Sequence, residues 1–157
     1  MTYSSQTKIT FYIKIDLTSA RALLQLYDYP LRLTRPAIYA AIGTVAHKIL
    51  ATSQAYMAYF PKTGRVYRLP DGRLHRASAV GEAPAILSGK LINSGHVQAR
   101  SGCSRKSIIQ WDVYFNAPYA GELEARYSRP YLSRATKELE EVFYDAIEKA
   151  VKTALRA

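Results

Sequence analysis

The sequence predicts an α+β fold, in which a small, mainly antiparallel β-sheet has two long α-helices packed on one face and a long basic loop or hairpin. Two stretches carry apolar residues at the three-, four- and seven-residue spacings of an amphipathic helix. Three others are rich in β-branched and aromatic residues, as strands are. Residues 61–89 show no periodicity. We therefore expect a single domain over residues 1–157, from which the segment 61–89 protrudes.

The first part of the chain contains one expected strand and two expected helices. Lys8–Asp16, with the sequence KITFYIKID, has the composition of a strand. A short helix is expected over residues 18–26, and the Tyr29-Pro30 step would end it because a residue before proline disfavours the helical conformation. Pro36 suits the first turn of a long helix that ends near Tyr59. Its apolar positions are Ile38, Ile42, Val45, Ile49 and Tyr56.

The segment 61–89 has the features of a functional loop. Pro-Asp-Gly at 70–72 is a turn signature, because proline presets one backbone dihedral and glycine tolerates a positive φ. Residues 66–69 and 73–76 can pair across this turn as a hairpin. Irregular segments of this length are uncommon in compact domains and tend to be functional or disordered.

The second half of the chain contains two expected strands and a final helix. Leu91–Ala99 and Ser107–Phe115 both have strand composition, and the polar connection 101–106 favours an antiparallel pair. A short bridge, residues 116–129, leads to a second long helical face. The apolar positions of that face are Leu139, Val142, Phe143, Ala146, Ile147, Ala150 and Leu155.

Composition indicates a folded, soluble protein. Hydrophobic residues make up 48% of the chain and charged residues 22%, which are globular values. The single cysteine, Cys103, cannot form an internal disulfide, so a reducing cytoplasm suits the chain. The polar N-terminus lacks the apolar core of a signal peptide, and no apolar run approaches the length of a membrane span. We expect no membrane association.

The net charge of +10 is unevenly distributed. Residues 1–60 carry +4, residues 61–106 carry +7 and residues 107–157 carry −1. A positive middle beside a slightly negative end suits either a polyanionic partner or a subunit whose one face attracts another face of its neighbour.

No set of residues indicates catalysis, so we expect no enzyme, no cofactor and no bound metal. None of the three histidines is paired at the four-residue spacing that places two metal ligands on one helical face. The strongest catalytic alternative is a metal-dependent nuclease, in which carboxylates hold magnesium and Arg76 or Arg126 steadies a phosphate. Its carboxylates would be Asp71, Asp112, Glu122 and Glu124.

Cationic and aromatic residues are interleaved in the first half of the 61–89 segment. Such residues can bind phosphates by charge and stack on exposed bases. Arginine also makes bidentate bonds to carboxylates, so an acidic protein partner is as plausible as nucleic acid. The candidate contact residues are Lys62, Arg65, Tyr67, Arg68, Arg73, His75 and Arg76.

Three short motifs resemble a family of tailed-phage proteins, the siphophage neck or tail-completion proteins that join head to tail. His75–Ala85, HRASAVGEAPA, resembles the family's Ser-x-x-Gly-x-x-Pro loop, and Ser88–Leu91 resembles the step that follows it. Asn116–Glu122, NAPYAGE, is similar to a Tyr-Ala strand end followed by a glutamate, although Leu123-Glu124-Ala125 then stands where the family has Gly-Thr. Arg129–Leu132, RPYL, resembles the Arg-Pro-Phe-Leu step before the last helix. The matched positions are Ser78, Gly81, Pro84, Gly89, Leu91, Tyr119, Ala120, Glu122, Arg129, Pro130, Tyr131 and Leu132.

The resemblance implies a structural virion protein that forms a homo-oligomeric ring, sixfold by analogy, at the head-tail junction. Such a protein would be made in the bacterial cytoplasm, and would contact neighbouring neck or connector proteins, tail-tube proteins and, transiently, the genomic DNA in the lumen. A DNA-binding module without a virion role is the alternative, and a metal-dependent nuclease is a third. Within the family motifs, we expect Pro130, Tyr131 and Leu132 to orient the terminal helix and close the core.

Overall fold

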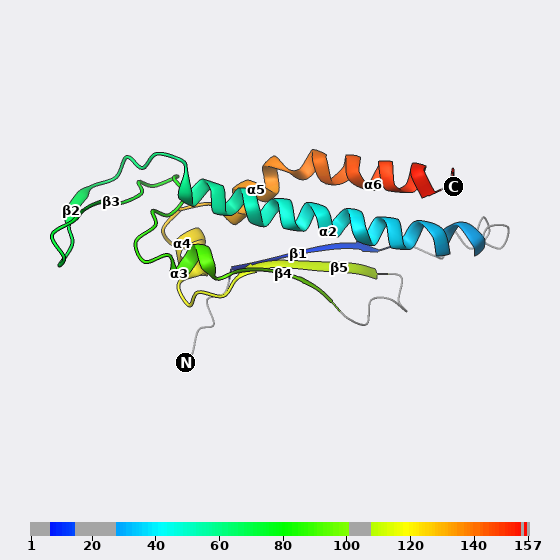
Figure 1. Ribbon diagram of the computed structural model, residues 1–157, viewed down its shortest axis with the longest axis horizontal. Helices are drawn as coiled ribbons and strands as arrows, with labels where there is room; N and C mark the ends of the chain where they lie inside the picture. The colour runs from blue at the N-terminus through cyan, green and yellow to red at the C-terminus, as the bar shows by residue number, and fades with distance from the viewer. Residues whose placement is uncertain (1–6, 15–27, 101–107, 155, 157) are drawn as a thin grey trace.

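The structure is a computed structural model that describes residues 7–14, 28–100, 108–154 and 156, with side chains described for 35–100, 109–154 and 156. It is an α+β fold, as the sequence predicts. The expected helix over 18–26 and the connection 101–106 lie outside the described residues. In chain order (Figure 1), the elements are β1 (Thr7–Lys14), α2 (Asp28–Ala58), β2 (Val66–Arg68), β3 (Leu74–Arg76), α3 (Lys90–Asn93), β4 (Gly95–Ala99), β5 (Ile108–Phe115), α4 (Ala120–Ala125), α5 (Leu132–Glu138) and α6 (Glu140–Ala154).

Three strands form the main sheet, in the order β1-β5-β4, and both neighbouring pairs are antiparallel. Val113 of β5 lies opposite Ile9 of β1 and Val97 of β4, which fixes the register. The expected first strand and the expected antiparallel pair are therefore confirmed. A second, two-stranded sheet consists of β2 and β3.

The long helix α2 begins earlier than the sequence predicts. It starts at Asp28 and continues through Pro30 and Pro36, so the expectation that the Tyr29-Pro30 step ends a helix is wrong. Pro30 lies in the first turn, where backbone N–H groups have no partner within the helix and a missing donor costs little. Pro36 lies inside the helix, which forgoes one backbone hydrogen bond there.

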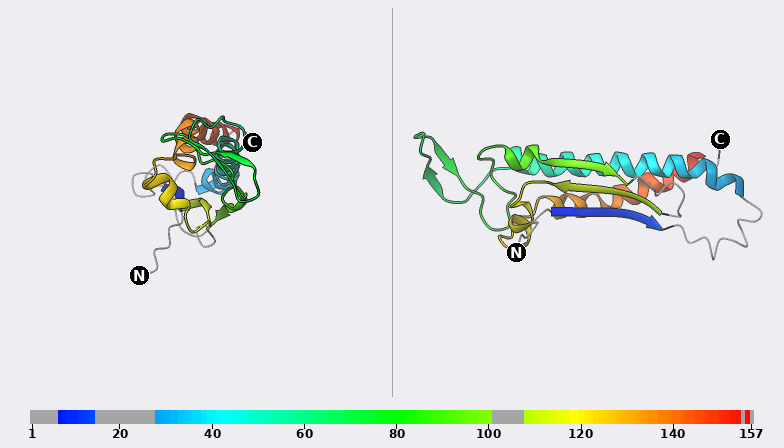
Figure 2. Two further views of the ribbon diagram at one scale, coloured as in Figure 1. Left: turned by 90° about the vertical axis from the view of Figure 1, so that its left-hand side faces the viewer. Right: turned by 90° about the horizontal axis from the view of Figure 1, so that it is seen from below.

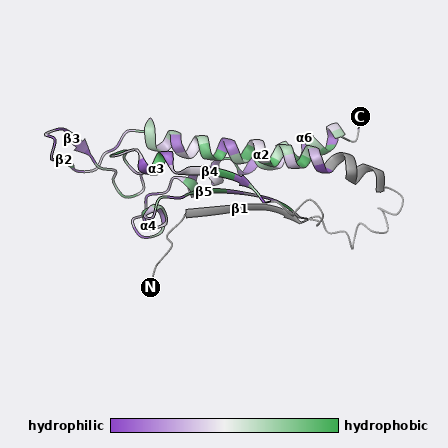
Figure 3. Cartoon of the chain, turned by 60° about the horizontal axis from the view of Figure 1, so that its bottom comes forward, coloured by the Kyte–Doolittle hydropathy of each residue, from purple (hydrophilic) through white to green (hydrophobic). Residues whose placement is uncertain are grey.

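Both long helices lie on the same side of the main sheet, as the two views of Figure 2 show. Alternate residues of β5 face α2, because side chains along a strand point to opposite faces in turn. Ile109, Val113 and Phe115 are buried there. Helix α6 packs along α2, and apolar residues recur along both helices (Figure 3). The buried residues of α2 are Ile38, Ile42, Val45, Ala46, Ile49, Ser53, Tyr56 and Met57.

The expected strand over Leu91–Ala99 is wrong in its first half. Residues Lys90–Asn93 form a single helical turn, α3, and the strand begins only at Gly95. Gly89 enters this turn with a φ of 75°, which favours glycine, and Leu91 is buried. The hydroxyl of Ser94 donates to the Leu91 carbonyl and closes the turn. Burial of Leu91 thus outweighs the strand preference of its neighbours.

The last part of the chain contains more helix than the sequence predicts. The bridge 116–129 includes the short helix α4. The terminal helical face is divided into α5 and α6 at Leu139, which is buried and leaves the regular α conformation. Tyr131 and Leu132 are fully buried, which confirms that they close the core. Among the described helices, none combines the length and the apolar composition that a bilayer crossing requires.

The close contact between α2 and β5 gives a stability prediction at Gly43. A Cβ atom on Gly43 would lie 2.7 Å from Cζ2 of Trp111, whose ring is also held against Tyr39 at 5.0 Å between centroids. Alanine favours a helix by about 1 kcal/mol over glycine, but overpacking costs about 1–3 kcal/mol. We expect Gly43→Ala to lower the free energy of unfolding by about 1 kcal/mol, measured by urea denaturation. Thr44→Ala, at the exposed neighbouring position, should change it by less than about 0.5 kcal/mol, and an equal loss in both variants would contradict this explanation.

Candidate functional site: a basic hairpin beside an apolar groove

The β2-β3 hairpin projects from one end of the molecule (Figure 1). Its turn is closed by two backbone hydrogen bonds, from Gly72 N to Leu69 O at 2.9 Å and from Leu69 N to Arg73 O at 2.8 Å. Gly72 has a φ of 84°, as the Pro-Asp-Gly signature requires. Hydrogen bonds from the side chain and then the backbone N–H of Arg73 lower the pKa of the Asp71 carboxyl. The predicted hairpin is confirmed, with its turn locally ordered.

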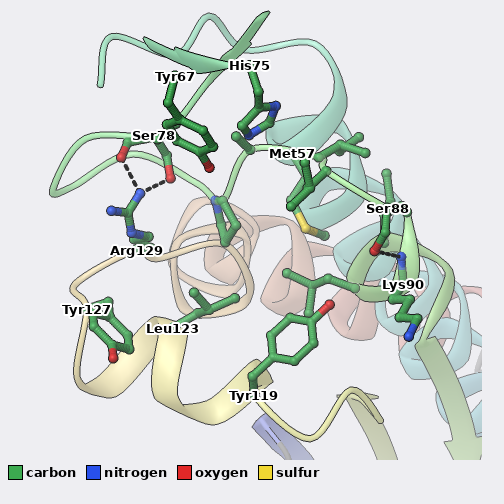
Figure 4. A pocket seen from close by; sticks show the side chains of 18 residues that line it. Met57, Tyr67, His75, Ser78, Ser88, Lys90, Tyr119, Leu123, Tyr127 and Arg129 are labelled. Atoms are coloured by element: carbon green, nitrogen blue, oxygen red, sulfur yellow. Dashed lines mark hydrogen bonds between the residues drawn. The ribbon is translucent and has the colours of Figure 1, made fainter. Parts of the chain in front are cut away.

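The hairpin has two chemically different faces. Tyr67 lies opposite His75 in the register, and their rings meet edge-on with centroids 5.4 Å apart. Both side chains point toward the body of the protein (Figure 4). The alternate residues occupy the other face, which we call the outer face, since paired residues share a side of a sheet. The outer face consists of Val66, Arg68, Leu74 and Arg76, all exposed.

An apolar groove of about 550 Å³ lies beneath the inner face of the hairpin (Figure 4). Tyr67 and His75 form one wall and the segment 84–92 forms a second. Tyr119, Leu123 and Tyr127, on and beside α4, contribute the third. The groove thus joins three parts of the chain that are far apart in sequence, and most of its lining is apolar.

The base of the hairpin is held by the carboxylate of Glu82. Its oxygens accept hydrogen bonds from the hydroxyl and the backbone N–H of Thr63, and from the backbone N–H of Ala79 at 2.8 Å. The Thr63 hydroxyl bond, the two backbone bonds and the nearby Lys62 charge lower the pKa of Glu82 to about 2. One ionised carboxylate therefore ties together the two segments that enter and leave the hairpin.

A second tie links the segment after the hairpin to the start of the last helical region. One guanidinium nitrogen of Arg129 donates to both the carbonyl and the hydroxyl of Ser78 (Figure 4), and Gly81 N donates to Ser128 O at 2.7 Å. Ser78 is buried, so both of its oxygens need these partners. Ser78 and Gly81 belong to one of the family-like motifs and Arg129 to another, and the fold brings the two into contact.

The remaining motif positions lie around the same groove and core, with one exception. Pro84, Gly89, Leu91 and Tyr119 line the groove. Ala120 is buried, and its carbonyl accepts a hydrogen bond from the Tyr131 hydroxyl at 3.2 Å. Glu122 is exposed on α4 and does not line the groove.

Glu124 has a structural role that the sequence analysis missed. Its Oε1 accepts hydrogen bonds from the backbone N–H groups of Tyr131, Leu132 and Ser133, at 2.8–3.0 Å. These are the first N–H groups of α5, which have no acceptor within the helix. The cap comes from seven to nine residues upstream, so no local capping pattern reveals it. Glu124, which belongs to the Leu123-Glu124-Ala125 stretch where the resembled pattern has Gly-Thr, anchors α5.

The seven predicted contact residues have three different positions. Arg65, Arg68, Arg73 and Arg76 are exposed on the hairpin, as a contact role requires. Tyr67 and His75 face the groove and not the outer face of the hairpin. Lys62 is partly buried and donates to the Tyr56 carbonyl near the end of α2 at 2.8 Å. Desolvation by burial lowers the Lys62 pKa, and its charge serves the hairpin base.

The carboxylates of the nuclease alternative have separate roles. Asp71 lies in the hairpin turn and Glu124 caps α5. Asp112 is buried on β5 and accepts a hydrogen bond from Arg100 Nε at 2.9 Å. Within the described part of the chain, no three His, Cys, Asp or Glu residues are grouped closely enough to bind a metal ion.

The Glu82 network predicts a pH-dependent hairpin base. Because the folded-state pKa is about 2 and the ordinary value is 4.5, the network stabilises the fold above pH 4.5, and this contribution is lost as pH falls toward 2. We expect Glu82→Gln to destabilise the protein at pH 7, and the difference from wild type to shrink below pH 4.5. Urea denaturation across pH, with hydrogen exchange at the Thr63 and Ala79 amides, measures it. A difference independent of pH would show that the charge is irrelevant.

Comparison of the chain with protein-family models, with curated proteins and with solved structures found no match in any of the three. A function for the hairpin and groove is therefore inferred from their geometry and charge, together with the short motifs of the sequence.

Proposed function

We propose that this protein is a structural protein of a tailed-phage virion, which forms a ring at the head-tail junction and completes or joins the tail. One observation carries the proposal: most of the large hydrophobic side chains that are exposed among the described residues lie at the hairpin end, beside the four exposed arginines of the hairpin. Twelve large hydrophobic residues are exposed among the described side chains; eight lie within residues 59–89 and two within 119–127. Patches of this kind mark protein interaction surfaces. The ten are Tyr59, Phe60, Val66, Tyr67, Leu74, Val80, Ile86, Leu87, Tyr119 and Tyr127.

The positions of the family-like motifs support the same proposal. Residues that match three separate motifs meet at the hairpin base, where Arg129 contacts Ser78 and where Pro84, Gly89 and Tyr119 line one groove. If the chain shares the architecture of the family that it resembles, the motifs should lie together in one structural unit, as these do. The resemblance and the geometry thus favour one region as the assembly surface.

A ring places two demands on each subunit. Head-to-tail contacts need two different patches that are complementary to each other, since only such contacts close into a ring about an axis. The positive hairpin end and the acidic first turns of α6 are candidates for these patches. The neighbouring partners would be neck or connector proteins and tail-tube proteins, with transient contact to DNA in the lumen.

The proposal predicts closed rings. Purified protein, alone or mixed with tails and DNA-filled heads of the phage that encodes it, should form a ring of defined order, six by analogy, because each subunit offers two complementary patches. Native mass spectrometry and electron microscopy detect such rings. Monomers alone, even with heads and tails present, would rule out this function.

A DNA-binding module is the second candidate, and the four exposed arginines of the hairpin favour it. Binding through phosphates should weaken steeply as salt rises, because condensed counterions are released on binding. Replacing Arg65, Arg68, Arg73 and Arg76 together with glutamine should abolish such binding, measured by fluorescence anisotropy with double-stranded DNA. Unchanged affinity in this variant would remove the candidate.

A further inference from the structure

We infer that the outer face of the hairpin of one subunit binds the start of α6 on a second copy of this chain. The binding surface on the second copy, which we call the α6 shoulder, consists of Glu140, Glu141, Tyr144 and Asp145. This inference rests on the proposed ring, and it identifies the two patches that would join the subunits. Its basis is a match of charge and apolar groups between two surfaces at separate places on the molecule.

The outer face is exposed, and no described part of the chain buries it. Arg68 and Arg76 flank the aliphatic side chains of Val66 and Leu74, and Leu74 is 70% exposed. The two arginines form no ion pair with a described residue, whereas Arg73 is paired with Asp71. A two-stranded hairpin is marginally stable by itself in water. Covering this face would bury its aliphatic groups and fix its position.

The α6 shoulder has the opposite charge and one exposed aromatic side chain, Tyr144. Glu141 and Asp145 are one turn apart, as are Glu140 and Tyr144, so the four residues form two adjacent rows on the helix surface. All four are exposed, and Tyr144 is 63% exposed. The three carboxylates form no ion pair with described residues. Beside them lies a groove of about 390 Å³ between α5, α6 and Ile49 of α2.

These two surfaces are complementary in charge, and both carry exposed apolar groups. Each combines charged and apolar groups, so two guanidinium groups can meet carboxylates while Leu74 and Val66 pack on Tyr144 and the adjoining groove. Arginine suits such a contact because its planar fork binds carboxylates bidentately. Opposite potentials across an interface also set its register and exclude other pairings.

Geometry favours binding between copies over binding within one chain. The hairpin projects from one end of the molecule, whereas α6 runs from α5 toward the other end (Figure 1). A subunit that gives its hairpin to one neighbour therefore keeps its own shoulder free for another. Contacts of this head-to-tail type propagate from subunit to subunit, and they close into a ring when the rotation between neighbours divides a full turn.

Charge reversal tests the contact. We expect Arg68→Glu with Arg76→Glu to weaken self-association at least about tenfold, and Glu141→Arg with Asp145→Arg to do the same, because each places like charges across the interface. The four changes combined in one chain should restore assembly. Lys48→Glu with Arg156→Glu changes the net charge by the same amount as the hairpin variant at exposed sites elsewhere and should leave assembly unchanged. Analytical ultracentrifugation measures assembly, and circular dichroism confirms folding.

Disulfide trapping tests the geometry directly. In a Cys103→Ser background, which removes the only natural cysteine, a Leu74→Cys chain is mixed with a Tyr144→Cys chain of different mass. We expect the mixed disulfide dimer to exceed both same-variant dimers under mild oxidation. A Leu74→Cys chain mixed with Thr44→Cys, an exposed site on α2, is the matched control and should give little mixed product.

The outcomes separate this inference from the proposed function. Rings that persist in both charge-reversal variants, without a 74–144 disulfide, would overturn the inference and leave the ring proposal standing. Wild-type protein that stays monomeric with heads and tails would overturn both. Loss of DNA affinity in the Arg68→Glu, Arg76→Glu variant with assembly unchanged would assign the outer face to nucleic acid and overturn the inference.

Discussion

The burial of one face of β5 under α2 is the contact on which the other parts depend. Val113 and Phe115 are fully buried between the sheet and the helix, and Gly43 lets the Trp111 ring approach the α2 backbone. Since β5 is the central strand, this packing fixes both of its neighbours. The same helix also supports α6, so its two sides hold the sheet and the terminal helix in one arrangement. The hairpin end therefore projects from a packed core.

Two charged residues connect the segments that flank the hairpin to that core. Glu82 accepts hydrogen bonds from Thr63, in the segment that leads into β2. Arg129 donates to Ser78 and so holds it against the segment that leads to α5. A third, Glu124, supplies the acceptor that the first turn of α5 lacks. Each of these side chains forms hydrogen bonds with backbone or buried groups, which explains why charged residues occupy these positions. Arg68 and Arg76, on the outer face of the hairpin, are exposed instead.

The cationic residues of the hairpin segment therefore differ in their surroundings, which depend on where each residue lies in the fold. Lys62 and Arg73 are cationic residues of the same segment as Arg68 and Arg76, yet the first supports the end of α2 and the second stiffens the turn. Arg68 and Arg76 share the outer face with two aliphatic residues. A surface that combines both kinds of group suits a protein partner better than a phosphate backbone alone, which offers charge without an apolar counterpart.

The sequence by itself determined the fold class, the β1, β5 and hairpin strands, and the apolar faces of the long helices, because these depend on local periodicity and turn chemistry. It also indicated that residues 61–76 carry an unusual positive charge. Only the tertiary structure decided that α2 continues through Pro30, that Leu91 enters a helical turn, and that Glu82, Glu124 and Arg129 anchor the hairpin end. Those outcomes depend on burial and on hydrogen bonds between residues far apart in sequence, which local patterns do not contain.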